Sequence, residues 1–121
     1  AITIRDQNYH EALNQVDFIK KFIFPGGFLP SVTAMSHSIS TATNMKMNHL
    51  EDIGHHYART LSDWRKRFFN QIEQVRAMGY PESFIRMWEY YFCYCEGGFT
   101  ETDIGTVQMV LAKHRVLPSN A

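Results

Sequence analysis

The sequence predicts an α/β domain in which three strands alternate with about four helices. Strand-like apolar runs open and close the chain, apolar stripes of helical period lie between them, and glycine and proline fall at the expected boundaries. The predicted order is strand, two helices, strand, two helices, strand. That order fits the second half of an open α/β sheet better than a complete one.

The first half of the chain is expected to contribute two strands and two helices. The expected elements are a strand at residues 1–4, a helix from about 8 to 24, a weaker helix from about 32 to 41, and a strand at 45–53. Asn8 is a suitable N-cap for the first helix. Pro25, Gly26 and Gly27 end that helix, because proline and two glycines cannot easily continue it.

The second half carries the clearer helical signals. The expected elements are a helix from about 56 to 78, a helix from about 81 to 98, and a strand at 104–112. An apolar stripe marks the first of these helices at Tyr57, Leu61, Trp64, Phe68, Ile72 and Val75. Gly79 ends it, and Gly97 and Gly98 end the second helix. Residues 1–113 therefore form one domain, and 114–121 are expected to be a flexible tail.

Composition excludes several classes of function. The 121 residues hold 12 basic and 12 acidic side chains, so the formal net charge is zero and no basic run is present to bind nucleic acid. No apolar run reaches the length of about 18 to 20 residues that spans a bilayer. Cys93 and Cys95 lie on different sides of a predicted helix and are poorly placed for a disulfide, which favours a cytoplasmic location.

No local motif for chemistry is evident. The six histidines lack the spacing of metal ligands, and His55 and His56 fit a solvated helix start. Glu51 and Asp52 are adjacent in a predicted strand, so their side chains point to opposite faces and do not form an acid and base pair. Glycine-rich phosphate loops and nucleophile elbows are also absent from the sequence. The chain is therefore a binding module or part of an enzyme.

Four segments together resemble a known family. They are FPGGFLPS at 24–31, LEDIGHHYARTLSDW at 50–64, FIRMWEYYFCYCEGGF at 84–99 and IGTVQMVLAK at 104–113. In order and spacing they resemble the C-terminal part of cyclopropane-fatty-acyl-phospholipid synthases and of the related mycolic-acid methyltransferases. The resemblance implies a Rossmann-like class I methyltransferase sheet, of which this chain would supply strands 5, 6 and 7 in the order 5-7-6. The glycine-rich loop that binds S-adenosylmethionine would precede residue 1.

The chemistry implied by the resemblance is methyl transfer from a sulfonium to a cis double bond of a lipid acyl chain, followed by proton loss and ring closure. Such chemistry needs a dry apolar tunnel and a weak base nearby. Tyr57 matches a position whose phenol helps to hold a bicarbonate ion as that base, and Ile2 matches a position that contributes its backbone. The alternative for Tyr57 is a ring that simply packs in the core.

The resemblance also implies the residues that line the acyl channel. Tyr91, Cys95 and Phe99 share one helical face and match channel positions, and Leu61 is a further candidate. Ordinary core packing is the alternative for each of them. Cys95 is not expected to be a nucleophile, because a buried cysteine without a neighbouring base behaves as a small hydrophobic group.

The implied substrate partners are unsaturated phospholipid acyl chains. Arg65, Lys66 and Arg67 are candidates to meet lipid head groups at the inner membrane face, with a solvated helix face as the alternative. The exposed edge of the first strand favours a homodimer. Two hypotheses follow: an inactive C-terminal fragment of an S-adenosylmethionine-dependent lipid methyltransferase, or a stand-alone module that binds lipid or protein without catalysis.

Overall fold

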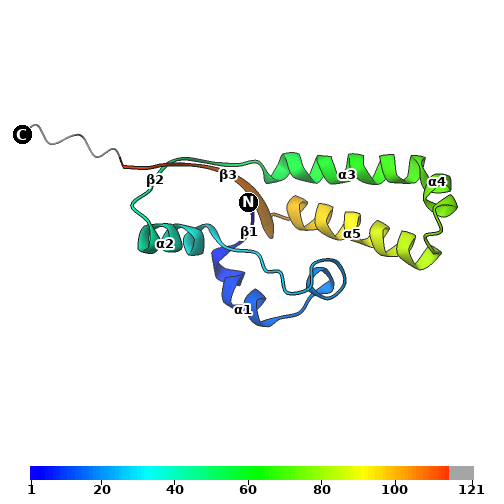
Figure 1. The fold of residues 1–121 in the computed structure, drawn as a ribbon, viewed down its shortest axis with the longest axis horizontal. Helices are drawn as coiled ribbons and strands as arrows, with labels where there is room; N and C mark the ends of the chain where they lie inside the picture. Colours follow the sequence, from blue (N-terminus) through cyan, green and yellow to red (C-terminus); the bar gives the residue numbers. More distant parts are fainter. Residues whose placement is uncertain (115–121) are drawn as a thin grey trace, which may run out of the picture.

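The computed structural model describes residues 1–114, and these form a three-stranded sheet with helices packed around it (Figure 1). The elements in chain order are β1 (Ile2–Ile4), the 3-10 turn η1 (Asp6–Asn8), α1 (Tyr9–Asn14), the π-helical turn η2 (Ile19–Ile23), α2 (Val32–Ala42), β2 (Lys46–Asp52), α3 (Gly54–Asn70), α4 (Ile72–Ala77), α5 (Glu82–Thr100) and β3 (Ile104–Ala112). The predicted alternation of strands and helical segments is confirmed, but three α-helices, rather than the predicted two, lie between β2 and β3.

The sheet has the strand order β1-β3-β2, and β3 is antiparallel to both neighbours. The predicted order 5-7-6 is therefore confirmed. Ile4 lies opposite Ile104, so the end of β1 is beside the start of β3. On the other side, a bulge between Met47 and His49 interrupts the pairing of β2 with β3.

Helices α3 and α5 form a long hairpin that extends away from the sheet in Figure 1. Their contact faces hold the buried cluster of Leu61, Phe92 and Phe99. Aromatic and aliphatic side chains at three- and four-residue spacing produce this seam, as the sequence predicted. The cluster continues onto the sheet through Ile2 and Ile104, so the helix hairpin and the strands share one core.

The first predicted helix is interrupted. Helix α1 ends at Asn14, and Gln15 takes an extended conformation with φ −93° and ψ 147°. The chain then enters η2, where the Asp17 carboxylate accepts a hydrogen bond from the Lys20 N–H at 2.9 Å. A carboxylate in this position caps a new turn, and so the continuous helix over 8–24 was a wrong prediction.

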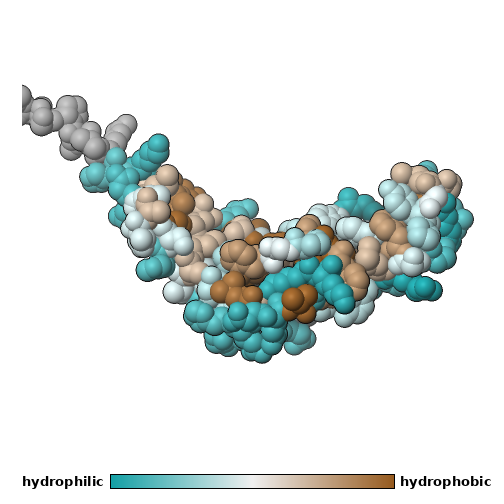
Figure 2. Space-filling view, turned by 60° about the horizontal axis from the view of Figure 1, so that its bottom comes forward, coloured by the Kyte–Doolittle hydropathy of each residue, from teal (hydrophilic) through white to brown (hydrophobic). Residues whose placement is uncertain are grey.

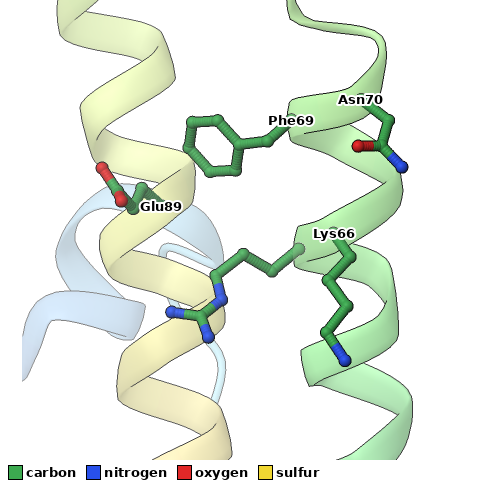
Figure 3. A pocket seen from close by; sticks show the side chains of 5 residues that line it. Lys66, Phe69, Asn70 and Glu89 are labelled. Atoms are coloured by element: carbon green, nitrogen blue, oxygen red, sulfur yellow. The ribbon is translucent and has the colours of Figure 1, made fainter.

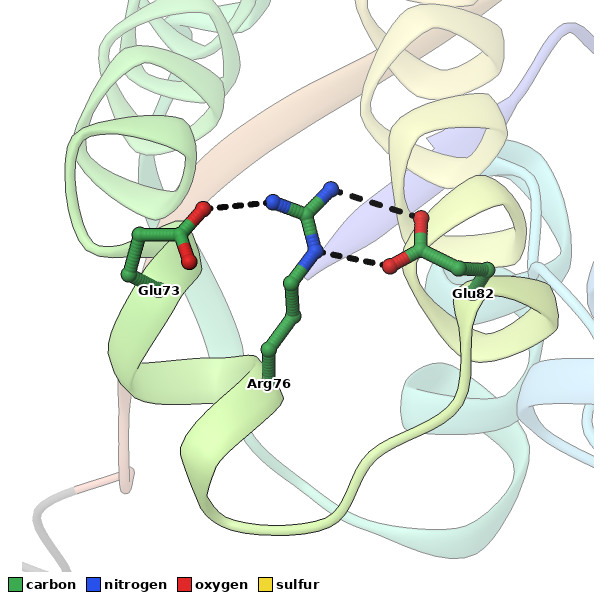
Figure 4. A network of polar contacts seen from close by, with 3 residues as sticks. All are labelled: Glu73, Arg76 and Glu82. Atoms are coloured by element: carbon green, nitrogen blue, oxygen red, sulfur yellow. Dashed lines mark hydrogen bonds and ion pairs between the residues drawn. The ribbon is translucent and has the colours of Figure 1, made fainter.

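The helix predicted over 56–78 differs at both ends. It begins at Gly54, whose N–H donates to the Asp52 carboxylate at 2.8 Å, and it breaks at Gln71 before α4. The break turns the chain toward α5. There the Arg76 guanidinium bonds Glu73 at 2.6 Å and Glu82 at 2.7 Å, and this bridge joins α4 to the start of α5 (Figure 4).

Helix α5 does not end at Gly97 and Gly98, as the sequence predicted, but continues to Thr100. A Cβ atom on Gly98 would lie 3.1 Å from both Cγ1 and Cδ1 of Ile104. Gly98 therefore allows helix and strand to approach closely. The predicted stop was wrong because a glycine can serve packing rather than termination.

Candidate functional site

The structure brings the six candidate site residues into one cluster. Leu61 and Phe99 belong to its buried centre, and the partly buried residues packed against that centre include Ile2, Tyr57, Tyr91 and Cys95. They come from β1, α3 and α5, which are far apart in sequence. The arrangement satisfies the proximity that a shared acyl site requires, and it is equally the arrangement of a packed core.

Tyr57 lies near the start of α3, half-buried, with its ring against the cluster. Its ring centroid is 4.9 Å from that of Phe99 and 6.0 Å from that of Trp64. The Tyr57 hydroxyl makes no hydrogen bond to the residues that the structure describes. The phenol therefore retains its full capacity to bond an external group.

Ile2 lies on the outer strand of the sheet, opposite Thr106. Its neighbour Ala1 exchanges two hydrogen bonds with Val107, at 2.8 and 2.9 Å. Because such bonds alternate along an antiparallel pair, the N–H and C=O of Ile2 point away from β3, toward the edge where the Ile4 N–H donates to the Pro30 carbonyl at 3.0 Å. A backbone role for Ile2, as the resemblance implies, stays a prediction.

The four channel candidates differ in depth. Leu61 and Phe99 are only 1% and 3% exposed, so neighbouring side chains cover them. Tyr91 and Cys95 are partly exposed and offer surface next to them. Burial is the main cause that raises the pKa of Tyr91, and it raises the pKa of Cys95 to about 11. Both groups are therefore neutral at pH 7, which suits an apolar wall. A nucleophilic cysteine would instead need to be a thiolate.

A hollow of about 390 Å³, which sequence reasoning missed, lies at the ends of β1 and β2. Its lining includes Thr3, Asp52, Phe99 and Gly105. In open α/β sheets, ligands bind at the carboxyl ends of the parallel strands, and β1 and β2 both end here. The sequence did carry a signal for this hollow, namely glycines close to the acidic end of a predicted strand. Gly105 is needed there because a Cβ atom on it would lie 3.1 Å from the Asp52 carboxylate.

A shallower groove of about 350 Å³ lies between α3 and α5. Figure 3 shows the Phe69 ring of α3 pointing toward α5, on which Glu89 lies, whereas Lys66 lies along α3. Arg65 also lines the groove and donates to the Cys93 thiol at 3.1 Å. Arg65 is thus engaged with α5, and Lys66 pairs with Asp63 of its own helix at 3.8 Å. Contact of this basic segment with lipid head groups stays a prediction.

No helix in residues 1–114 combines the length and the apolar character that a bilayer crossing requires. The same residues contain no group of three or more histidine, cysteine, aspartate and glutamate side chains placed to hold a metal ion.

The fold and the cluster can now be compared with known proteins. The family model for mycolic acid cyclopropane synthetase matches residues 1–109. The chain belongs to this family. The match covers every residue of the cluster and ends within β3, so the resemblance predicted from four segments is confirmed over nearly the whole chain.

The names of similar curated proteins describe enzymes that modify lipids. The chain is 34% identical over 113 residues to the tuberculostearic acid methyltransferase of Mycobacterium tuberculosis, and 36% identical over 101 residues to the cyclopropane-fatty-acyl-phospholipid synthase of Escherichia coli K12. These alignments cover 93% and 84% of this chain. In both cases the chain spans about a quarter of the relative's length, 26%.

Solved structures of the family share the fold. A cyclopropane synthase from Mycobacterium tuberculosis superposes with a TM-score of 0.80 at 23% identity, over 93% of this chain and 42% of the other. A mycolic acid cyclopropane synthase complexed with SAH and CTAB gives a TM-score of 0.74 at 24% identity, over 91% of this chain and 41% of the other. The predicted fold class, part of a methyltransferase sheet with its helices, is therefore confirmed.

Proposed function

We propose that this chain is the C-terminal part of an S-adenosylmethionine-dependent lipid methyltransferase of the cyclopropane synthase type, and that it forms the acyl-chain side of the active site. The observation that carries the proposal is the single cluster that unites Tyr57, Ile2 and the α5 wall of Tyr91 and Cys95. Family membership and the names of the relatives support the reaction class.

The cofactor is assigned to sequence outside these 121 residues, which contain no glycine-rich loop for it. S-adenosylmethionine, when bound, supplies the methyl group as an electrophilic sulfonium. The complex of one structural relative with SAH and CTAB supports the choice of cofactor and of an acyl-like substrate, because SAH is the demethylated cofactor and CTAB carries a long alkyl chain. On this proposal the isolated chain is inactive, since it would hold the acyl chain without the methyl donor.

The residues of this chain hold the acyl chain and keep it dry. An alkene has no strong hydrogen-bonding group, so contact with apolar side chains fixes it by burial, at about 25 cal/mol per Å². Tyr91 and Cys95 offer a neutral surface, and Leu61 and Phe99 support it from behind. The ring faces of Tyr57 and Tyr91 stabilise positive charge on the reacting carbons by roughly 0.5 to 2 kcal/mol each.

Proton removal is assigned to the edge of β1. The outward-facing N–H of Ile2 and the Tyr57 hydroxyl, which has no hydrogen-bond partner among residues 1–114, belong to one cluster and are donors for a small anion. They support the bicarbonate ion that the family resemblance implies. Bicarbonate, when bound there, supplies the weak base. Tyr57 and Ile2 orient that anion and stabilise its charge by hydrogen bonds.

The substitution Tyr57→Phe tests the assignment, because it removes the hydroxyl and keeps the packed ring. In the protein at its natural length, we expect label transfer from S-adenosylmethionine to an unsaturated phospholipid to fall by roughly tenfold or more. Tyr80→Phe is the matched control, since Tyr80 is 43% exposed and stacks on Phe84 at the far end of the hairpin. Full activity of Tyr57→Phe would remove the proposed role, and an unchanged melting temperature would exclude a folding defect.

A further inference from the structure

Three phenylalanine rings project into solvent from one short turn. Phe22, Phe24 and Phe28 are 55%, 57% and 57% exposed, and they lie within seven residues. The Gly27 N–H donates to the Phe24 carbonyl at 3.0 Å, and Gly26 has φ +81°, so the backbone between the rings forms a closed turn. We call residues 18–28 the aromatic turn. Large rings gathered in solvent at one place commonly mark a binding surface.

The base of the aromatic turn is anchored on α5. The Phe18 ring lies 4.6 Å from that of Tyr90, edge to face, and 6.0 Å from that of Tyr94. The Tyr94 hydroxyl donates to the Asp17 carboxylate at 3.0 Å. These contacts fix the turn while its outer rings stay exposed. Tyr94 directly precedes Cys95 in α5, so the turn is attached next to a residue of the proposed acyl wall.

Two cations precede the exposed rings. Lys21 places its ammonium 5.3 Å from the centroid of the Phe22 ring, in solvent. Lys20 donates to the carbonyls of Ala12 and Gln15, which ties the turn to the end of α1. Aromatic rings flanked by lysines match the chemistry of a bilayer interface, where rings enter the acyl boundary and ammonium groups meet anionic phosphates.

We propose that the aromatic turn docks on an anionic phospholipid bilayer, with Phe22, Phe24 and Phe28 in the interface and Lys21 at the phosphates. The inference rests on the proposed function, because an enzyme that works on acyl chains must reach them from the membrane surface. Figure 2 looks onto the side of the molecule that α1 and this turn form, and it shows hydrophobic patches next to hydrophilic ones there. The aromatic turn contacts α5 at Tyr90 and Tyr94, which directly precede Tyr91 and Cys95 in the sequence.

Vesicle sedimentation tests the proposal. The protein at its natural length is mixed with vesicles of phosphatidylcholine and phosphatidylglycerol, and the bound fraction gives a partition coefficient. Replacing the three phenylalanines by serine should lower it by roughly tenfold or more, and Lys21→Gln by about fivefold at low salt. Met78→Ser is the control, because Met78 is 72% exposed at the hairpin tip without neighbouring exposed lysines, and its partition should stay within about twofold.

Absence of vesicle binding by the unmodified protein, equal binding by the triple serine variant, or an equal loss in Met78→Ser would overturn the proposal. A triple variant that melts at a lower temperature and still binds vesicles would show that the rings cover another part of the protein, and this too would overturn it. Methyl transfer to the same lipid dispersed in detergent is measured in parallel. If no methyl transfer to the dispersed lipid occurs, the proposed function is wrong. The vesicle-binding result tests the docking surface independently of that outcome.

Discussion

The two adjacent glycines of α5 give a sharp test of how the helix meets the sheet. A Cβ atom added at Gly97 would meet no atom within 4 Å, and Gly97 is exposed. Alanine loses less backbone entropy than glycine when it joins a helix, by roughly 0.5 to 1 kcal/mol. We therefore expect Gly97→Ala to raise the free energy of unfolding by that amount.

Gly98→Ala should have the opposite effect. Its Cβ would lie 3.1 Å from both Cγ1 and Cδ1 of Ile104, closer than an ordinary van der Waals contact. Ile104 packs against the buried cluster and pairs with Ile4 on β1, so it cannot move aside without disturbing the core. Overpacking of this kind costs about 1 to 3 kcal/mol, which exceeds the helical gain. The net loss is about 1 kcal/mol, and the two variants should differ by about 2 kcal/mol.

Urea unfolding followed by far-ultraviolet circular dichroism at pH 7 measures both values. The double variant Gly98→Ala with Ile104→Val adds a check, because valine lacks Cδ1 and removes one of the two close contacts. Its loss of stability should be smaller than the sum of the two single losses. Equal stabilisation by Gly97→Ala and Gly98→Ala would refute the reasoning, and so would strict additivity in the double variant.

The remaining predictions concern a thiol and an ion pair. Burial raises the pKa of Cys95 to about 11, so at pH 8 its thiolate fraction is roughly two orders of magnitude below that of an ordinary thiol. Mass spectrometry after treatment with iodoacetamide should show that the exposed Cys93 is modified first. The rate of Cys95 modification should rise with pH up to about pH 11. Equal rates for the two cysteines at pH 8 would contradict this. Arg76→Gln should lower the urea midpoint only slightly, and less at high salt, because the Arg76 bridge is exposed to solvent. A shift as large as that of Gly98→Ala would be inconsistent with this.

The sequence was most informative where apolar side chains repeat. The stripe that includes Tyr57 and Leu61 predicted α3, and the stripe through Tyr91 and Phe99 predicted α5, because helical period places such residues on one face. The errors fall where tertiary contact overrides a local signal. Gly98 resembles a helix stop until the strand that packs against it is known.

The sequence predicted which candidate side chains share a helix face, but not how deeply each of them is buried. Periodicity placed Leu61 and Phe99 on the same faces as Cys95, yet only the packed structure shows which side chains retain exposed surface. The hollow beside Asp52 was missed for a related reason. Its shape depends on the close approach of Gly54 to Gly105, two residues that the chain brings together only through sheet pairing.

The central position of β3 explains why the candidate residues meet. Because β3 is antiparallel to β1, Ile104 lies beside Ile4, and this places the end of α5, with Phe99, at the carboxyl end of β1. Because β3 also pairs with β2, the N–H of Ile53 bonds the Thr106 carbonyl at 2.7 Å, and α3 therefore begins at the same edge. One further turn of α3 carries Tyr57 onto the Phe99 ring. A sheet with β3 at its margin would separate these helices, so the strand order is itself a requirement of the proposed site.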